Sequence, residues 1–349
     1  MFSPNRAYFA VVLSMLFFAT PWVAQNYPNQ IASFANTFEK AALQVASQAA
    51  AVIMHNPRTI SELQTKYTTT TLAMATSSVG SEVTTPVGNV AKVRILLVPG
   101  HEPNFGGTEF GSLKEREMNV ELAQDLSKLL LADPHFQVYT TRDNKAWNPV
   151  FDSYFKNDWK AIIAWRKSLH NELINMISTG STTAPVSKVF HLRSPDDVAL
   201  RLYGITKWAN ENIMDVVIHI HFNDFADHKD GFPGKHTGFS IYVPVKQYAN
   251  STTTKAVAAN ILKRLEADYK VSNLPGESTG IVDEPDLIAI GSNNTADAAS
   301  MLIEYGYIYE TKFRTAAKRS ATLEQMAKDT YLGLQDFFTS NVGVTPRYF

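Results

Sequence analysis

The stretch ILLVPGHEPNFGGTEFGSLKEREMNVELA, residues 95–123, decides how this chain folds. Its first part is an apolar strand pattern that stops at Pro99-Gly100, and His101 follows at once. A glycine-bearing loop then leads to an acidic cluster at the start of a helical pattern. An imidazole at a buried strand end and carboxylates at the next helix start are costly to bury without partners. A shared metal ion would serve as partner to both.

Strand and helix patterns alternate from this stretch to the end of the chain. The apolar periodicity predicts five strands, at residues 92–100, 136–143, 214–222, 238–245 and 299–308. It predicts four helices between and after them, at residues 118–133, 196–213, 254–269 and 323–338. This alternation is typical of a three-layer α/β/α domain with a mainly parallel twisted sheet. Ligands of such sheets bind beyond the carboxyl ends of the strands, where His101 and the end of the strand at 214–222 are expected.

The regions outside this domain are expected to be an anchor and a connection. Arg6 precedes an 18-residue apolar run, so residues 1–27 are expected to be a signal peptide or a helical membrane anchor. Trp22 lies where a cleavage site after Ala24 would need a small residue, which favours an uncleaved anchor. Residues 28–91 are expected to be a juxtamembrane helix followed by a Thr/Ser-rich exposed linker over residues 68–85.

The catalytic domain is expected over residues 92–340, with an inserted helical excursion at about 144–195. The first part of this insertion is rich in aromatic residues, and the part from Asp158 to Ile177 has helical spacing. The insertion would either wall the substrate groove or pack as a peripheral subdomain.

Composition excludes several classes of function. The 349 residues are 45% hydrophobic and 19% charged, which is ordinary for a globular protein. The net charge of −1 gives no basic field for nucleic acid. The chain has no cysteine, which excludes a Cys-ligated metal, a thiol nucleophile and a disulfide framework. A metal site would have to use histidines and carboxylates, and that donor set suits Zn²⁺.

Four residues are candidates for a hydrolytic zinc site. Such sites use three His, Asp or Glu ligands and leave one position for water. His101, Glu115 and His221 are placed at strand ends and a helix start for this purpose, although Glu109 and Glu117 compete with Glu115. Glu304 is a lone carboxylate in an apolar strand. It would serve either as a general acid and base or as the partner of a buried arginine.

These residues stand in a pattern that resembles the zinc-dependent N-acetylmuramoyl-L-alanine amidases, the type-3 amidase family of cell-wall hydrolases. Six motifs occur in family order between residues 93 and 338, and each is weak alone. The family's Asp-Pro-Gly-His-Gly-Gly corresponds to residues 98–103, its Lys-Glu-Lys-x-x-Asn-Leu to residues 114–120, and its Thr-Arg to residues 141–142. Its Ala-Asn corresponds to residues 209–210, its Ser-Ile-His-Ala-Asn to residues 219–223, and its Val-Glu-x-Gly-Phe-Ile to residues 303–308.

The resemblance implies zinc bound by His101, Glu115 and His221, with Glu304 as the catalytic carboxylate. The implied reaction is hydrolysis of the amide between N-acetylmuramic acid and the L-alanine of the peptidoglycan stem peptide. The protein would then be exported to the cell envelope, either secreted or anchored in the membrane by its N-terminal segment. Further residues that would support the ligands or contact substrate are His219, Asn223, Asn119 and Arg142.

The chain also departs from the family pattern. Val98 replaces the aspartate, Glu102 and Pro103 replace the paired glycines, and His219 replaces the serine. Because strand positions two apart face the same side, His219 is expected on the side of His221. It would support the ligands in place of the serine, or be a buried histidine bonded to backbone.

Two other functions remain open at this point. One is another zinc amidohydrolase or carboxypeptidase of similar fold, which would cleave a different bond. The other is a catalytically inactive wall-binding or regulatory homologue. The departures favour the inactive homologue, whereas the survival of all three ligand candidates and of Glu304 opposes it. The motifs do not identify a regulatory partner.

Overall fold

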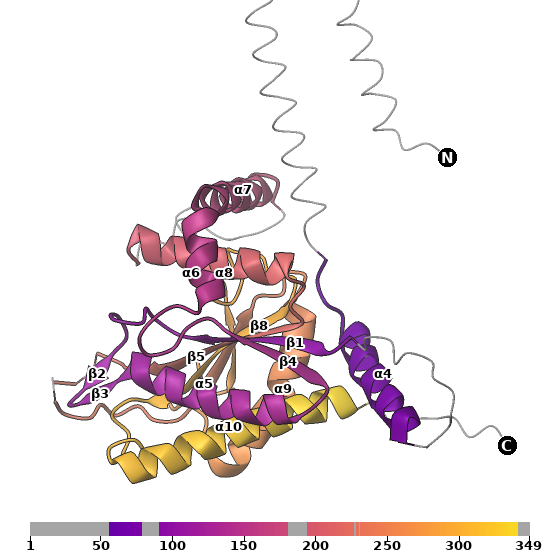
Figure 1. Ribbon diagram of the computed structural model, residues 1–349. Helices are drawn as coiled ribbons and strands as arrows, with labels where there is room; N and C mark the ends of the chain where they lie inside the picture. Colours follow the sequence, from indigo (N-terminus) through magenta and orange to yellow (C-terminus); the bar gives the residue numbers. More distant parts are fainter. Residues whose placement is uncertain (1–55, 79–90, 181–193, 227, 230, 341–349) are drawn as a thin grey trace, which may run out of the picture. The chain divides into compact units, whose positions relative to one another are not determined.

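The computed structural model describes residues 56–78, 91–180, 194–226, 228–229 and 231–340 (Figure 1). The expected anchor over residues 1–27 and the expected helix before residue 56 lie outside these described residues. Within the described ranges, no helix is long and apolar enough to cross a membrane.

A six-stranded sheet forms the centre of the domain, in the order β4-β1-β5-β8-β6-β7. The first four strands, β4 (Phe136–Thr140), β1 (Val93–Pro99), β5 (Val216–Asn223) and β8 (Ala299–Tyr307), are mutually parallel. Strand β6 (Ser240–Pro244) runs antiparallel to β8, and β7 (Ile281–Glu284) runs parallel to β6. The expected α/β fold with a mainly parallel sheet is confirmed. The hairpin of β2 (Glu109–Phe110) and β3 (Leu113–Lys114) was not expected.

Helices cover both faces of the sheet (Figure 1). One layer contains α5 (Glu115–Ala132), α9 (Ser251–Asp268) and α10 (Ala316–Thr339). The other contains α6 (Pro149–Asn157), α7 (Trp159–Ser178) and α8 (Asp196–Glu211). Strand β1 shows why two layers form. Ile95 and Leu97 belong to the core beneath α5, whereas Leu96 and Val98 belong to the core beneath α8, so both faces of the strand are buried.

The described part of the insertion is a packed pair of helices, α6 and α7. Phe151, Phe155 and Trp165 share one apolar core with Leu96 of β1 and Tyr203 of α8. The indole Nε1 of Trp165 also donates a hydrogen bond of 3.1 Å to Asn294 Oδ1. These aromatic residues of α6 and α7 therefore belong to the core of an outer layer over α8, and the role of the whole insertion stays a prediction.

The expected linker over residues 68–85 is wrong for residues 68–78, which belong to helix α4 (Ile60–Ser78). Residues 68–78 are helical, because the helix buries Leu63 and Tyr67 in the main core. The ring of Tyr67 stacks on Phe338, with centroids 5.4 Å apart. The Thr68 hydroxyl donates back to the carbonyl of residue 64, so a threonine-rich segment remains compatible with a helix. The proposed division of the chain into anchor, connection and catalytic domain stays a prediction.

Candidate functional site

His101, Glu115 and His221 come together at the carboxyl ends of the strands. His101 lies two residues after the end of β1, Glu115 is the first residue of α5, and His221 lies two residues before the end of β5. One potential ligand atom from each lies within 4.8 Å of the others. Oε1 of Glu115 is 2.8 Å from Nε2 of His101 and 2.9 Å from Nδ1 of His221. The two imidazole rings meet edge to face, with centroids 4.9 Å apart.

The local backbone explains how residues so far apart in sequence converge. Strands β1 and β5 are neighbours, and the Gly100 N–H donates to the Ile220 carbonyl at 2.9 Å. A Cβ at Gly100 would lie 2.2 Å from the His221 ring, so this position accepts glycine alone. His101 itself has a φ of 69°, a left-handed conformation that costs about 1–3 kcal/mol in a residue with a side chain. The strained turn aims its ring at Glu115.

The protonation states of the cluster suit a metal. Burial alone would raise the pKa of Glu115, but the nearby imidazoles of His101 and His221 hold it well below its ordinary value. Burial lowers the pKa of His221, although the Glu115 carboxylate opposes this shift. An ionised carboxylate beside a neutral imidazole is the form in which these side chains ligate metals.

One orphaned atom tests whether the cluster fits a metal ion. Nε2 of His101 is buried and has no hydrogen-bond partner among the described residues, despite lying 2.8 Å from a carboxylate oxygen. A buried nitrogen without a partner is costly unless a ligand satisfies it. Two histidines and one glutamate are also the protein ligands of several catalytic zinc sites. The residues present therefore fit zinc.

Glu304 lies beside this cluster on β8. In the parallel pairing of β5 with β8 it is directly opposite His221. Burial raises the pKa of Glu304 well above its ordinary value, and the nearby carboxylates of Glu115 and Glu277 raise it further. Its Oε2 is buried without a hydrogen-bond partner, and no cation forms an ion pair with it in the described part of the chain. The described residues therefore do not show the alternative role of Glu304, a structural ion pair with a buried arginine.

Asn119 and Arg142 hold the turn that carries His101. Asn119 Nδ2 donates to the Gly100 carbonyl at 3.2 Å. Arg142 Nε donates to the Pro99 carbonyl at 3.1 Å, and its Nη2 donates to the carbonyl of Gly100. Burial lowers the pKa of Arg142 to about 10. Both side chains contact backbone carbonyls, so the structure places them as supports of the turn.

His219 and Asn223 lie on the same strand as His221. His219 is buried, and its cross-strand neighbours are Val98 and Leu302. Neither of its ring nitrogens has a hydrogen-bond partner in the described residues, so it is bonded neither to backbone nor to His221. Burial, aided by the nearby His221, lowers its pKa to about 3. Asn223 ends β5, and its carbonyl accepts from the Ile308 N–H at 3.0 Å.

Three further residues lie near the site: Glu102 and Thr108 were not singled out as site residues from the sequence, and Asp224 was weighed only as a substrate contact or a cap of the turn. Glu102 is buried, and its Oε1 accepts from Arg201 Nε of α8 at 2.7 Å. Thr108 and Asp224 hydrogen-bond to each other through their side chains at 2.7 Å. In the sequence Glu102 was marked by its departure from the amidase pattern, and Asp224 by its place next to Asn223 at the strand end. The bond between Thr108 and Asp224 could not be seen in the sequence, because it joins segments more than 100 residues apart.

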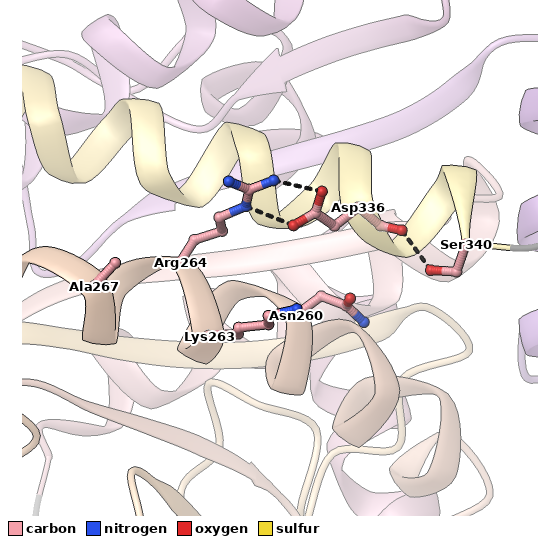
Figure 2. A pocket seen from close by; sticks show the side chains of 6 residues that line it. All are labelled: Asn260, Lys263, Arg264, Ala267, Asp336 and Ser340. Atoms are coloured by element: carbon pink, nitrogen blue, oxygen red, sulfur yellow. Dashed lines mark hydrogen bonds and ion pairs between the residues drawn. The ribbon is translucent and has the colours of Figure 1, made fainter.

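A separate hollow lies between α9 and α10 (Figure 2). Figure 2 shows the guanidinium of Arg264 facing the carboxylate of Asp336, and their two hydrogen bonds measure 2.5 and 2.7 Å. The residues that line the hollow are Asn260, Lys263, Arg264, Ala267, Asp336 and Ser340. None of the predicted site residues is among them.

Comparisons with known proteins agree with the motifs. Residues 166–336 match the family described as N-acetylmuramoyl-L-alanine amidase. A protein of Buchnera aphidicola (subsp. Acyrthosiphon pisum, strain APS), provisionally named an N-acetylmuramoyl-L-alanine amidase, is 26% identical over 256 residues, which cover 72% of this chain and 96% of that protein.

Two solved amidases also align with the chain. The amidase Ami1 of Mycobacterium smegmatis has a TM-score of 0.47 at 14% identity and covers 71% of this chain and 98% of its own. The CwlD amidase of Clostridioides difficile, solved in complex with the GerS lipoprotein, has a TM-score of 0.48 at 16% identity and covers 72% of this chain and 100% of its own.

The fold and the cluster of two histidines and a glutamate define an α/β protein with a candidate hydrolytic metal centre. The family match and the Buchnera relative confirm the resemblance to N-acetylmuramoyl-L-alanine amidases and support amide hydrolysis in peptidoglycan as the activity. A cell-wall amidase indicates an exported or envelope location. The family match begins at residue 166, so it includes His221 and Glu304, whereas His101 and Glu115 lie outside it.

Proposed function

We propose that this chain is a zinc-dependent amidase in which His101, Glu115 and His221 bind the ion and Glu304 is the catalytic carboxylate. The observation that carries the proposal is the convergence of three ligand atoms within 4.8 Å at the carboxyl ends of the strands, with Glu304 opposite His221. The bond cleaved would join the lactyl group of N-acetylmuramic acid to the L-alanine of the stem peptide.

The roles of the side chains follow from their environments. Zinc at this site would supply a Lewis acid that polarises a carbonyl and makes water a nucleophile near neutral pH. Glu304 would accept a proton from the attacking water and pass it to the leaving amine, since a raised pKa brings a carboxylate towards the working pH. Glu115 stays ionised between the two histidines, which leaves Glu304 as the carboxylate that exchanges protons.

The place of action is the second part of the proposal. The apolar run after Arg6 would anchor the enzyme in the membrane, so that the domain acts on peptidoglycan close to the membrane surface. This part rests on the sequence of residues 1–27 alone. Extraction of the protein from membranes by detergent, but not by salt, would support it.

The experiment that tests the activity uses the full chain with purified peptidoglycan, with and without added zinc. Mass spectrometry of the soluble products is expected to show stem peptides that begin with a free L-alanine. The Glu304→Gln variant, loaded with zinc to the same extent, serves as the control and is expected to release none. Removal of the metal with a chelator is expected to stop release, and zinc to restore it.

Other products would contradict the proposal in distinct ways. Release of single C-terminal amino acids from the stem peptide would indicate a carboxypeptidase on the same scaffold. Stoichiometric zinc without any cleavage would favour the inactive wall-binding homologue. Absence of bound zinc would refute the metal centre itself.

A further inference from the structure

Thr108 contacts the proposed ligand Glu115 through both of its backbone groups. Its N–H donates to Oε2 of Glu115 at 2.9 Å, and its carbonyl accepts from the N–H of Glu115, also at 2.9 Å. The second carboxylate oxygen, Oε1, accepts from the Phe222 N–H at 3.2 Å. The orientation of the carboxylate therefore depends on where the backbone of Thr108 lies.

The side chain of Thr108 is tied to the other ligand-bearing loop. Its Oγ1 donates to Oδ2 of Asp224 at 2.7 Å, and Asp224 lies three residues after His221. The other oxygen of Asp224 lies 2.8 Å from Nε2 of His228. The ring of His228 meets Tyr309 edge to face, with centroids 5.0 Å apart. Each oxygen of Asp224 thus has a partner within the described residues, and this fixes the direction of the oxygen that accepts from Thr108.

Hydrogen bonds, rather than apolar packing, fix this part of the chain. Gly106 and Gly107 directly precede Thr108 and have φ values of 85° and 79°. Phe105, before them, is 46% exposed to solvent. Glycines give a loop wide conformational freedom, and an exposed segment has little buried surface to restrain it. The bond to Asp224 is the side-chain contact that restrains Thr108.

We propose that Thr108 and Asp224 are positioning residues that hold Glu115 in the orientation which binds the metal. This inference rests on the proposed zinc site and adds two residues to it. Neither side chain touches the ion's proposed ligand atoms directly; Asp224 acts through Thr108, and Thr108 acts through its N–H. Hydrogen bonds that orient a ligand in this way typically change metal affinity by about 10–100-fold when they are removed.

The test compares Thr108→Val with Thr108→Ser in the full chain. Valine has nearly the shape of threonine but lacks the hydroxyl, whereas serine keeps it. The primary readout is the dissociation constant of zinc, measured by competition with a chromogenic chelator. We expect zinc binding to Thr108→Val to be weaker by about 10–100-fold, and binding to Thr108→Ser to stay within about threefold of the parent.

Two further variants separate positioning from a general loss of structure. Asp224→Ala is expected to match Thr108→Val, and the double variant is expected to be no worse than either single one, because both remove one bond. Thr69→Val in α4 removes a hydroxyl that donates to the Thr65 carbonyl, and it is expected to leave zinc binding unchanged. The melting temperature of each metal-free variant shows whether the fold is retained.

The outcomes distinguish this inference from the proposed function. Parent-like zinc affinity in Thr108→Val, or additive losses in the double variant, would overturn the positioning role and leave the zinc site standing. A parent protein that binds no zinc would overturn both. Loss of affinity in Thr108→Ser equal to that in Thr108→Val would also overturn it, because the hydroxyl would then not be the cause.

Discussion

Both ends of the parallel strands bury carboxylates, but they satisfy them in opposite ways. At the amino end Asp215 directly precedes β5, and it is bonded to Lys66 Nζ and to the Arg94 N–H and lies 3.7 Å from Arg58 Nε. At the carboxyl end two buried atoms have no hydrogen-bond partner in the described residues: Oε2 of Glu304 and Nε2 of His101. At the amino end the carboxylate is bonded within the chain, although Arg58 Nε itself makes no hydrogen bond in the described residues. At the carboxyl end an acceptor and a donor without hydrogen-bond partners lie at one cluster of potential ligands.

Whether buried polar atoms are satisfied distinguishes structural from functional residues better than backbone strain does. His101 at the carboxyl end and Ile213 near the amino end both have positive φ, at 69° and 53°. Ile213 only closes the turn between α8 and β5 and is 52% exposed. Unsatisfied buried polar atoms that converge on one point are the rarer feature, because each costs about 1–3 kcal/mol. Convergence is therefore what identifies the site.

The largest effect is expected at Glu304. Replacing it with glutamine keeps the shape of the side chain and removes the proton acceptor, so kcat on peptidoglycan should fall by about 100–10,000-fold. Zinc stoichiometry should remain that of the parent, since Glu304 is not a proposed ligand. Metal analysis and product release measured on the same sample check both statements. A variant that keeps more than about a tenth of the parental rate would show that another group carries the proton.

The matching change at the other end of the sheet is Asp215→Ala. It leaves two cationic side chains and the Arg94 N–H without their carboxylate, which should lower the free energy of unfolding by about 3 kcal/mol. Zinc affinity of the folded protein should not change. Urea denaturation and chelator competition measure the two quantities. If zinc affinity fell as well, Asp215 at the amino end of the strands would affect the metal site at their carboxyl end. The two ends could then not be assigned separate structural and functional roles.

A smaller effect is expected when a methyl group is added beside the ligands. Gly107→Ala would place a Cβ 2.9 Å from His101 Cδ2 and 3.1 Å from Glu115 Oε2. Gly111→Ala is the matched control, because Gly111 also has a positive φ but nothing within 4 Å of its Cβ position. Both changes should cost about 1–2 kcal/mol of stability, and only Gly107→Ala should weaken zinc binding, by about tenfold. Equal zinc affinity in the two variants would mean that the loop moves aside.

The parts of the fold that follow from local patterns were predictable. The five expected strands are all present. Strands β1, β5 and β8 are buried on both faces and are almost continuous apolar runs, which a sequence displays directly. Strand β7 and the hairpin of β2 and β3 were missed, since four-residue and two-residue strands carry too little pattern. Residues 68–78 read as a linker because threonine and serine are common in loops, and burial of Leu63 and Tyr67 outweighs that preference.

In the candidate site, too, residues in local motifs were predictable and contacts between distant segments were not. His101, Glu115 and His221 were found because each belongs to a short motif, and the fold brings them within reach of one another. Their roles, and that of Glu304, stay predictions. The bond between Thr108 and Asp224 was missed, because it joins segments 116 residues apart and neither residue belongs to a motif. That His219 has no hydrogen-bond partner among the described residues likewise depends on which side chains surround it.

The smallest effect is expected at a carboxylate that lies at neither end of the parallel strands. Asp329 of α10 is buried, and its Oδ2 has no hydrogen-bond partner among the described residues, yet no ligand candidate lies with it. Burial raises its pKa to about 6 from an ordinary value of 3.8, and the nearby Asp268 adds to the shift. Such an aspartate destabilises the fold once it ionises. The penalty is absent below pH 3.8, grows between pH 3.8 and 6, and is complete above pH 6.

Asp329→Asn should therefore stabilise the protein at pH 8 by about 1 kcal/mol, after allowance for solvent screening, and by much less at pH 4.5. Denaturation at the two pH values measures the gain, and amide hydrolysis should be unchanged because Asp329 is not part of the proposed site. A stabilising effect that did not depend on pH would assign the gain to packing. A loss of activity would show that a single carboxylate oxygen without a hydrogen-bond partner can mark a functional site even where no other such atoms converge on it. Convergence would then no longer distinguish the two ends of the sheet.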